Sequence, residues 1–116
     1  MFTVYVTVTV ATILANFAIV VADLARAEFV LANMAEVGVP SSALPVLAAL
    51  KAAGAAGLLL GLLGLDAIGV AAAAGLVLFF VGSVVVHVRA GVFHNIAYPG
   101  TFLILALASL TLGIAR

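Results

Sequence analysis

The chain has 116 residues, of which 68% are hydrophobic and 7% are charged, and its formal net charge is zero. A water-soluble domain this small cannot bury so much apolar surface, so the composition predicts a protein embedded in the lipid bilayer. The zero net charge argues against a nucleic-acid partner, and the absence of cysteine excludes disulfides, thiolate metal sites and thiol–disulfide chemistry within this chain. We expect one transmembrane domain over residues 1–116.

The first predicted span covers residues 1–22. Its start, TVYVTVTV, alternates with the period of a strand, but a single strand leaves its backbone unsatisfied in lipid, so we expect a helix. On that helix four polar side chains fall on one side and form a stripe: Thr9, Thr12, Asn16 and Asp23. The competing interpretation is a secretory signal peptide with a cleavage site at Ala25-Arg26-Ala27, although no Lys or Arg precedes the apolar run.

The segment 24–37 carries too many charges to cross a bilayer. Gly38 and Pro40 end it, and its polar and apolar residues separate onto two faces. We therefore expect an amphipathic helix at the membrane interface between spans 1 and 2, either separate from the first span or continuous with it. Glu28 lies off the polar face and is a candidate to point into the bundle.

Three further spans are predicted at about residues 45–64, 67–88 and 99–115. Asp66 is the expected N-cap of the third span, and the short connection makes spans 2 and 3 antiparallel neighbours. Glycines recur at helical spacing along both: Gly54, Gly57, Gly61, Gly64, Gly75 and Gly82. In lipid, such glycines let helix backbones approach closely, so they predict packing faces within the bundle or between copies of a homo-oligomer.

Four spans bring most of the polar residues to one end of the bundle: Asp23, Arg26, Glu28, Glu36, Lys51, His87, Arg89, His94, Asn95 and Tyr98. This end holds three of the four Lys and Arg residues, so the positive-inside rule favours the cytoplasmic side for it. We expect any binding site to lie at this end.

Lys51 lies about six residues, or roughly 9 Å, inside its predicted helix. An ammonium at the centre of a bilayer costs about 2.5–3.5 kcal/mol, so its presence needs an explanation. Three interpretations remain open. The side chain snorkels to the headgroups, it forms an ion pair with Asp23 or Glu28, or it offers a cation to a carbonyl or carboxylate of a ligand.

His87 and Arg89 end the third span, where they bind lipid phosphates or form a hydrogen-bonding pair for a quinone or another lipophilic carbonyl compound. Two histidines, His87 and His94, are too few for a haem or metal centre. Asn16 is expected to bond to a neighbouring helix. The candidate ligand-binding residues are Lys51, His87, Arg89, Asp23, Glu28, Asn16 and His94.

The residues from 29 to 91 contain several short motifs in a particular order: Asn33-Met34, Gly38-Val39-Pro40, Lys51 with Gly54 and Gly57, and His87-x-Arg89. In this order and spacing the chain resembles the DoxX family of small bacterial membrane proteins. The resemblance implies an all-α, four-helix integral membrane bundle in a bacterial plasma membrane. It also implies a place among subunits of quinone-linked oxidoreductases or partners in membrane redox-stress complexes.

Three hypotheses about function follow. The first is a non-catalytic subunit of a membrane oxidoreductase system, which binds a quinone non-covalently at the polar end and works with a soluble or membrane redox partner. The second is a membrane scaffold or assembly protein, and the third is an oligomeric transporter of small metabolites. The chain has no recognisable nucleophile–base pair, phosphate loop or metal-ligand spacing, so we do not expect a self-contained enzyme.

Overall fold

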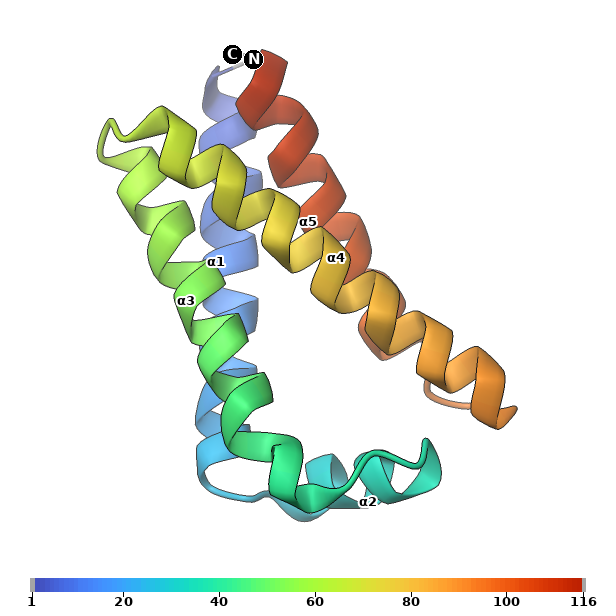
Figure 1. The fold of residues 1–116 in the computed structure, drawn as a ribbon. Helices are drawn as coiled ribbons and strands as arrows, with labels where there is room; N and C mark the ends of the chain where they lie inside the picture. The colour runs from blue at the N-terminus through green and yellow to red at the C-terminus, as the bar shows by residue number, and fades with distance from the viewer. Residues whose placement is uncertain (1, 116) are drawn as a thin grey trace.

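The computed structural model describes residues 2–115, which form helices and connecting turns (Figure 1). The elements are α1 (Phe2–Leu24), α2 (Glu28–Glu36), the short 3₁₀ helix η1 (Ser41–Ala43), α3 (Leu44–Leu62), α4 (Asp66–Ala90) and α5 (Ala97–Ala115). Helices α1, α3, α4 and α5 are long and apolar enough to cross a membrane. The expected all-α architecture with four spans is therefore confirmed, and the alternating start of the chain is helical because only a helix satisfies its own backbone in lipid.

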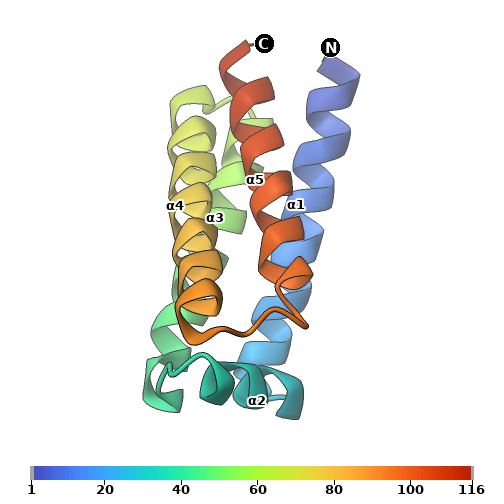
Figure 2. The same cartoon turned by 90° about the vertical axis from the view of Figure 1, so that its right-hand side faces the viewer.

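The four long helices form a bundle in the cyclic order α1, α3, α4, α5, since α3 packs on α1 and α4, and α5 packs on α4 and α1. Both ends of the chain lie at one end of the bundle, and α2 lies across the opposite end (Figures 1 and 2). This arrangement places the loop between α4 and α5 at the same end as α2 (Figure 2). The polar residues of both segments therefore gather there, as the span count predicts.

The turn after α1 separates it from α2. Arg26 has a positive φ of 54°, and the amides of Arg26 and Ala27 bond to the carbonyls of Asp23 and Ala22, which is the Schellman arrangement. The sequence left open whether the interfacial helix continues the first span, and this turn shows that it does not. Gly38 ends α2 in the same way, with φ 78°, as its position predicts.

Helices α3 and α4 approach most closely where two glycines face each other. A Cβ built on Gly61 would lie 2.6 Å from the Cα of Gly69, and one on Gly69 would lie 2.8 Å from the Cα of Gly61. Gly57 and Gly54 meet Ala72 and the Leu76 side chain in the same way, at 2.5 Å. These contacts confirm that the glycines of the second span form a packing face.

Other glycine and capping predictions are wrong in whole or in part. Gly75 and Gly82 lie on an exposed face of α4 with no atom within 4 Å of an added Cβ, so they do not pack within the chain, and packing between copies of a homo-oligomer stays a prediction. Gly64 lies after the end of α3 with φ 111°, so it closes the turn instead of lining the helix interface. Asp66 is the first residue of α4, and the capping position belongs to Leu65.

The polar stripe of α1 faces the bundle interior. Thr9, Thr12 and Asn16 are fully buried and Asp23 is 2% exposed. The Thr12 hydroxyl lies 2.9 Å from that of Ser109 on α5, and the Asn16 amide donates to the Thr12 carbonyl. The stripe thus joins α1 to α5 through Thr12 and brings Asp23 to the α2 end.

Candidate functional site

A cavity of about 590 Å³ lies between α2, α3, α4 and the start of α5. Its walls are mainly apolar, which suits a lipophilic molecule. Seven polar residues also line it: Asp23, Asn33, Lys51, Ser83, His87, Asn95 and Tyr98. Five of the six elements of the fold, or their adjoining turns, contribute to it, so the cavity depends on the tertiary structure as a whole.

Lys51 on α3 and Asp23 in the last turn of α1 form an ion pair in the cavity wall. The Lys51 Nζ lies 2.5 Å from an Asp23 carboxylate oxygen, and the two side chains are 9% and 1% exposed. The Nζ also lies 5.6 Å from the centre of the Phe79 ring, within cation–π range. Of the three interpretations of Lys51, the structure therefore shows the ion pair with Asp23, and burial excludes snorkelling. The paired charges cancel, which leaves this wall electrically neutral.

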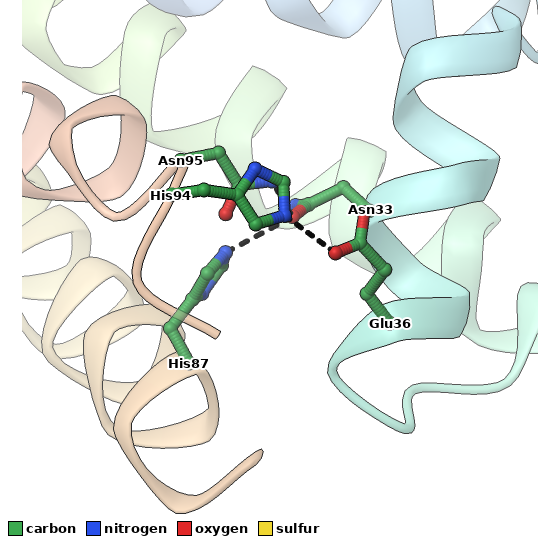
Figure 3. A network of polar contacts seen from close by, with 5 residues as sticks. All are labelled: Asn33, Glu36, His87, His94 and Asn95. Atoms are coloured by element: carbon green, nitrogen blue, oxygen red, sulfur yellow. Dashed lines mark hydrogen bonds and ion pairs between the residues drawn. The ribbon is translucent and has the colours of Figure 1, made fainter. Parts of the chain in front are cut away.

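His87 is buried near the end of α4 and uses both ring nitrogens. Its Nδ1 lies 2.7 Å from the Ser83 carbonyl oxygen, which only accepts, so Nδ1 carries a proton and donates. Its Nε2 lies 3.0 Å from the Asn33 side chain on α2, and the Asn95 amide donates to the same Asn33 oxygen at 2.7 Å (Figure 3). If His87 is an imidazolium, its Nε2 donates to the Asn33 oxygen. If His87 is neutral, its Nε2 accepts from the Asn33 amide nitrogen, with the Asn33 amide rotated by about 180°.

A second contact joins α2 to the loop between α4 and α5. The His94 Nε2 lies 2.6 Å from a Glu36 carboxylate oxygen, with side chains 65% and 42% exposed (Figure 3). Together, Asn33, Glu36, His87, His94 and Asn95 hold α2 against the ends of α4 and α5 (Figure 3). We call these five residues the α2 latch. Beneath α2, its apolar residues Val30 and Met34 pack on the bundle, so the latch and this packing close the water-facing side of the cavity.

The structure brings three of the predicted site residues together around the cavity: Asp23, Lys51 and His87. Arg89 lies outside it on an exposed surface, because two residues along a helix turn the side chain about 200° away from His87. The expected pairing of His87 with Arg89 is therefore wrong in geometry. Ligand binding by the three cavity residues stays a prediction.

The remaining predicted site residues also lie outside the cavity. Glu28 is exposed in the first turn of α2, so the expectation that it points into the bundle is wrong. Asn16 is buried outside the cavity and its amide bonds within α1, so the expected bond to a neighbouring helix is wrong. His94 is in the latch and does not line the cavity. Among residues 2–115, no three His, Asp or Glu side chains lie close enough to hold a metal ion.

Sequence reasoning missed four polar residues of the cavity: Asn33, Ser83, Asn95 and Tyr98. Asn33 belongs to the Asn33-Met34 motif that carries the family resemblance, and this was a usable signal for a site residue. Asn95 and Tyr98 lie in or beside a loop, and only the fold shows that they face α2.

Comparison with known proteins agrees with this architecture. Residues 7–109 match the DoxX-like family. The searches of curated proteins and of solved structures found no match. The family match covers most of the chain and includes all four long helices in whole or part. The chain is a multi-pass membrane protein and belongs to the DoxX-like family.

Proposed function

We propose that this DoxX-like protein binds a neutral lipophilic carbonyl compound, of which a quinone is the model, in the cavity beneath α2. In this proposal it is a non-catalytic subunit of a membrane oxidoreductase system in the bacterial plasma membrane. The observation that carries the proposal is the cavity itself: about 590 Å³, mainly apolar, with a buried lysine in one wall and six further polar residues in its lining.

The Lys51 ammonium supports a ligand oxygen as the group recognised. It has three N–H donors, and among residues 2–115 the only carboxylate in ion-pair contact with it is that of Asp23. A carbonyl oxygen in the cavity would accept a charge-assisted hydrogen bond from this ammonium, an interaction stronger than one between neutral groups. The chain thus supplies a directional donor at the edge of an apolar space.

The charge of the wall supports a neutral ligand. Asp23 and Lys51 already cancel each other at 2.5 Å, so a carboxylate or phosphate ligand would leave one uncompensated negative charge in a region shielded from water. A quinone brings no charge. This comparison favours a quinone-like compound over a fatty acid or a lipid phosphate.

The exposed part of the α2 latch supports a partner at the same end. His94 and Glu36 are polar and accessible beside the cavity, whereas the outer surfaces of the spans are apolar. A redox partner docked there would exchange electrons with a ligand held a short distance below. In this arrangement the chain binds and orients the ligand while the partner carries the electron transfer.

Equilibrium binding tests the proposal. The protein is reconstituted in vesicles and titrated with decylubiquinone, with the double variant D23N/K51M beside it, because removing both charges keeps the wall neutral while it deletes the ammonium donor. We expect saturable binding to the wild type, and about tenfold weaker binding to the double variant from loss of one charge-assisted bond. Arg89→Ala is the matched control, since this cation lies outside the cavity, and it leaves affinity unchanged.

Three results contradict the proposal. Absence of saturable binding to the wild type favours the scaffold hypothesis, in which the cavity holds ordinary lipid. Equal affinity of the wild type and D23N/K51M shows that Lys51 does not recognise the ligand. If Arg89→Ala alone weakens binding, the site lies on the outer surface of α4.

A further inference from the structure

We propose that the ligand reaches the cavity sideways from the hydrocarbon of the membrane, through a gap between α3 and α4, and not from water past α2. This inference rests on the proposed binding function and adds the route of access. It restricts the ligand class to molecules that dissolve within the bilayer.

The divergence of α3 and α4 makes the gap. The two helices are in backbone contact at Gly61 and Gly69, where no side chain fits between them. From there they spread apart toward the α2 end, so that they form a V whose open side points toward α2, at the bottom of Figure 1. The cavity occupies the wide part of this V, because its lining residues come from the α2-facing half of each helix.

Residues at the edge of the cavity face lipid. Leu50 on α3 and Leu78 on α4 both line the cavity, yet they are 53% and 73% exposed. Gly82, one turn further along α4, also lines the cavity and has no atom within 4 Å of an added Cβ. We call Leu50, Leu78 and Gly82 the portal. These exposed lining residues mark an opening of the cavity toward lipid, and Phe29 at the start of α2, 59% exposed, lies at the edge of the same cavity.

The depth of the portal in the membrane shows whether it faces lipid or water. Leu78 is the central residue of α4, with 12 helical residues before it and 12 after it in Asp66–Ala90. At the helical rise this puts it about 18 Å from either end, close to the midplane of a bilayer whose hydrocarbon is about 30 Å thick. Gly82 lies about 12 Å from the C-terminal end of α4 by the same measure. The portal therefore opens into acyl chains.

The side of the cavity beneath α2 is covered by contrast, apart from its edge at Phe29. There α2 covers it, held by two buried apolar residues, Val30 and Met34, and by the α2 latch. A ligand arriving from water must displace this helix, whereas one arriving from lipid meets an open apolar rim that leads toward Lys51 and His87. A molecule with an apolar body and a polar head fits this path when its head enters first.

The test measures the rate of ligand release in variants that plug the portal. The chain has no tryptophan, so Phe29→Trp on the exposed edge of the cavity gives a single fluorescent reporter that decylubiquinone quenches. In this background, Gly82→Leu places a helix-favouring side chain in the portal, where an added Cβ meets no atom within 4 Å. Gly75→Leu is the matched control, because Gly75 lies two turns away and lines a neighbouring hollow between α3 and α4, not this cavity.

Vesicles loaded with decylubiquinone are mixed with excess quinone-free vesicles, and recovery of fluorescence gives the release rate. We expect Gly82→Leu to slow release about tenfold or more, while Gly75→Leu keeps the wild-type rate. Unchanged or faster release from Gly82→Leu overturns the portal, and in that case the binding proposal survives. Absence of quenching in the reporter protein itself overturns the binding proposal and the portal with it.

Discussion

At the scale of single residues, the pairing of Asp23 with Lys51 decides how the bundle tolerates charge. The two side chains lie in contact and almost fully buried at the point where α1 ends and α3 faces the cavity. Each charge has a large desolvation penalty, and each is acceptable because the other is present. Stability should therefore depend on the pair and not on either partner alone.

This dependence gives a prediction for three variants. Asp23→Asn leaves the Lys51 ammonium without a counter-charge, and Lys51→Met leaves the Asp23 carboxylate without one. We expect each single change to cost about 3–5 kcal/mol, and the double variant D23N/K51M to recover most of that loss, since it buries no charge. Thermal unfolding in mild detergent measures all four proteins. Additive losses, with the double variant less stable than either single variant, would show that the two charges are not coupled.

The same scale shows where sequence reasoning works and where it fails. The stripe from Thr9 to Asp23 was predictable, because helical periodicity alone puts those residues on one side. The orientations of His87 and Arg89 could not be predicted. Helical periodicity shows that the two side chains point in different directions, but not which of them faces the interior. Contact between α2 and α4 decides this, because Asn33 reaches His87 and not Arg89.

At the scale of helices, the contact of α3 with α4 is set by two glycines. The backbone atoms that an added Cβ would meet at Gly61 and Gly69 cannot rotate away, unlike the side chain that Gly54 faces. A single methyl group at either position must push the helices apart. Because the contact lies at the closed end of the V, such a change also alters the cavity at the open end.

We therefore expect Gly61→Ala to destabilise the protein by about 1–3 kcal/mol, the usual range for overpacking. Gly75→Ala is the control: it adds the same methyl group to open space and should be neutral or slightly stabilising, because Ala favours a helix. Unfolding midpoints of the two variants in one detergent give the comparison. A Gly61→Ala protein as stable as Gly75→Ala would mean that α3 and α4 do not touch there.

The attachment of α2 gives a prediction of another kind. Asn33 receives two contacts of the latch, so Asn33→Ala leaves the His87 Nε2 and the Asn95 amide without this partner. A loss of about 1.4 kcal/mol, typical of a buried hydrogen bond, raises local opening about tenfold. Hydrogen exchange of the α2 amides should therefore accelerate by that factor.

The matched control for the latch is Glu36→Ala, which removes the exposed contact with His94. Exposed ion pairs contribute little, so exchange should change by no more than about twofold. If the two variants exchange alike, Asn33 does not hold α2.

Other features at this scale mark the limits of prediction from sequence. The helix bounds could be predicted because apolar runs in lipid have few alternatives, and each observed bound of the long helices lies within two residues of the expected span. Gly69, by contrast, stands alone in an alanine-rich stretch and was not recognised as a packing residue. Its role depends on the angle at which α3 crosses α4, and this angle is a property of both helices together.

At the scale of the whole molecule, α3 and α4 pack closely at the end of the chain termini and diverge toward the end that α2 covers. Packing of α3 on α4 closes one end, and their divergence makes room for a cavity beneath α2 (Figure 1). The sequence predicted which end would be polar, because the count of spans fixes it. It could not predict the cavity, since a void is made by the absence of contacts between helices far apart in the chain.

The most direct test of the central claim is to identify what the protein holds when it is purified. Wild-type protein, D23N/K51M and Arg89→Ala are purified in mild detergent, extracted with solvent and examined by mass spectrometry. We predict a quinone or another neutral lipophilic carbonyl compound, near one per chain, in the wild type and in Arg89→Ala, and about tenfold less in D23N/K51M. Phospholipid alone, in equal amounts from all three proteins, would contradict the account.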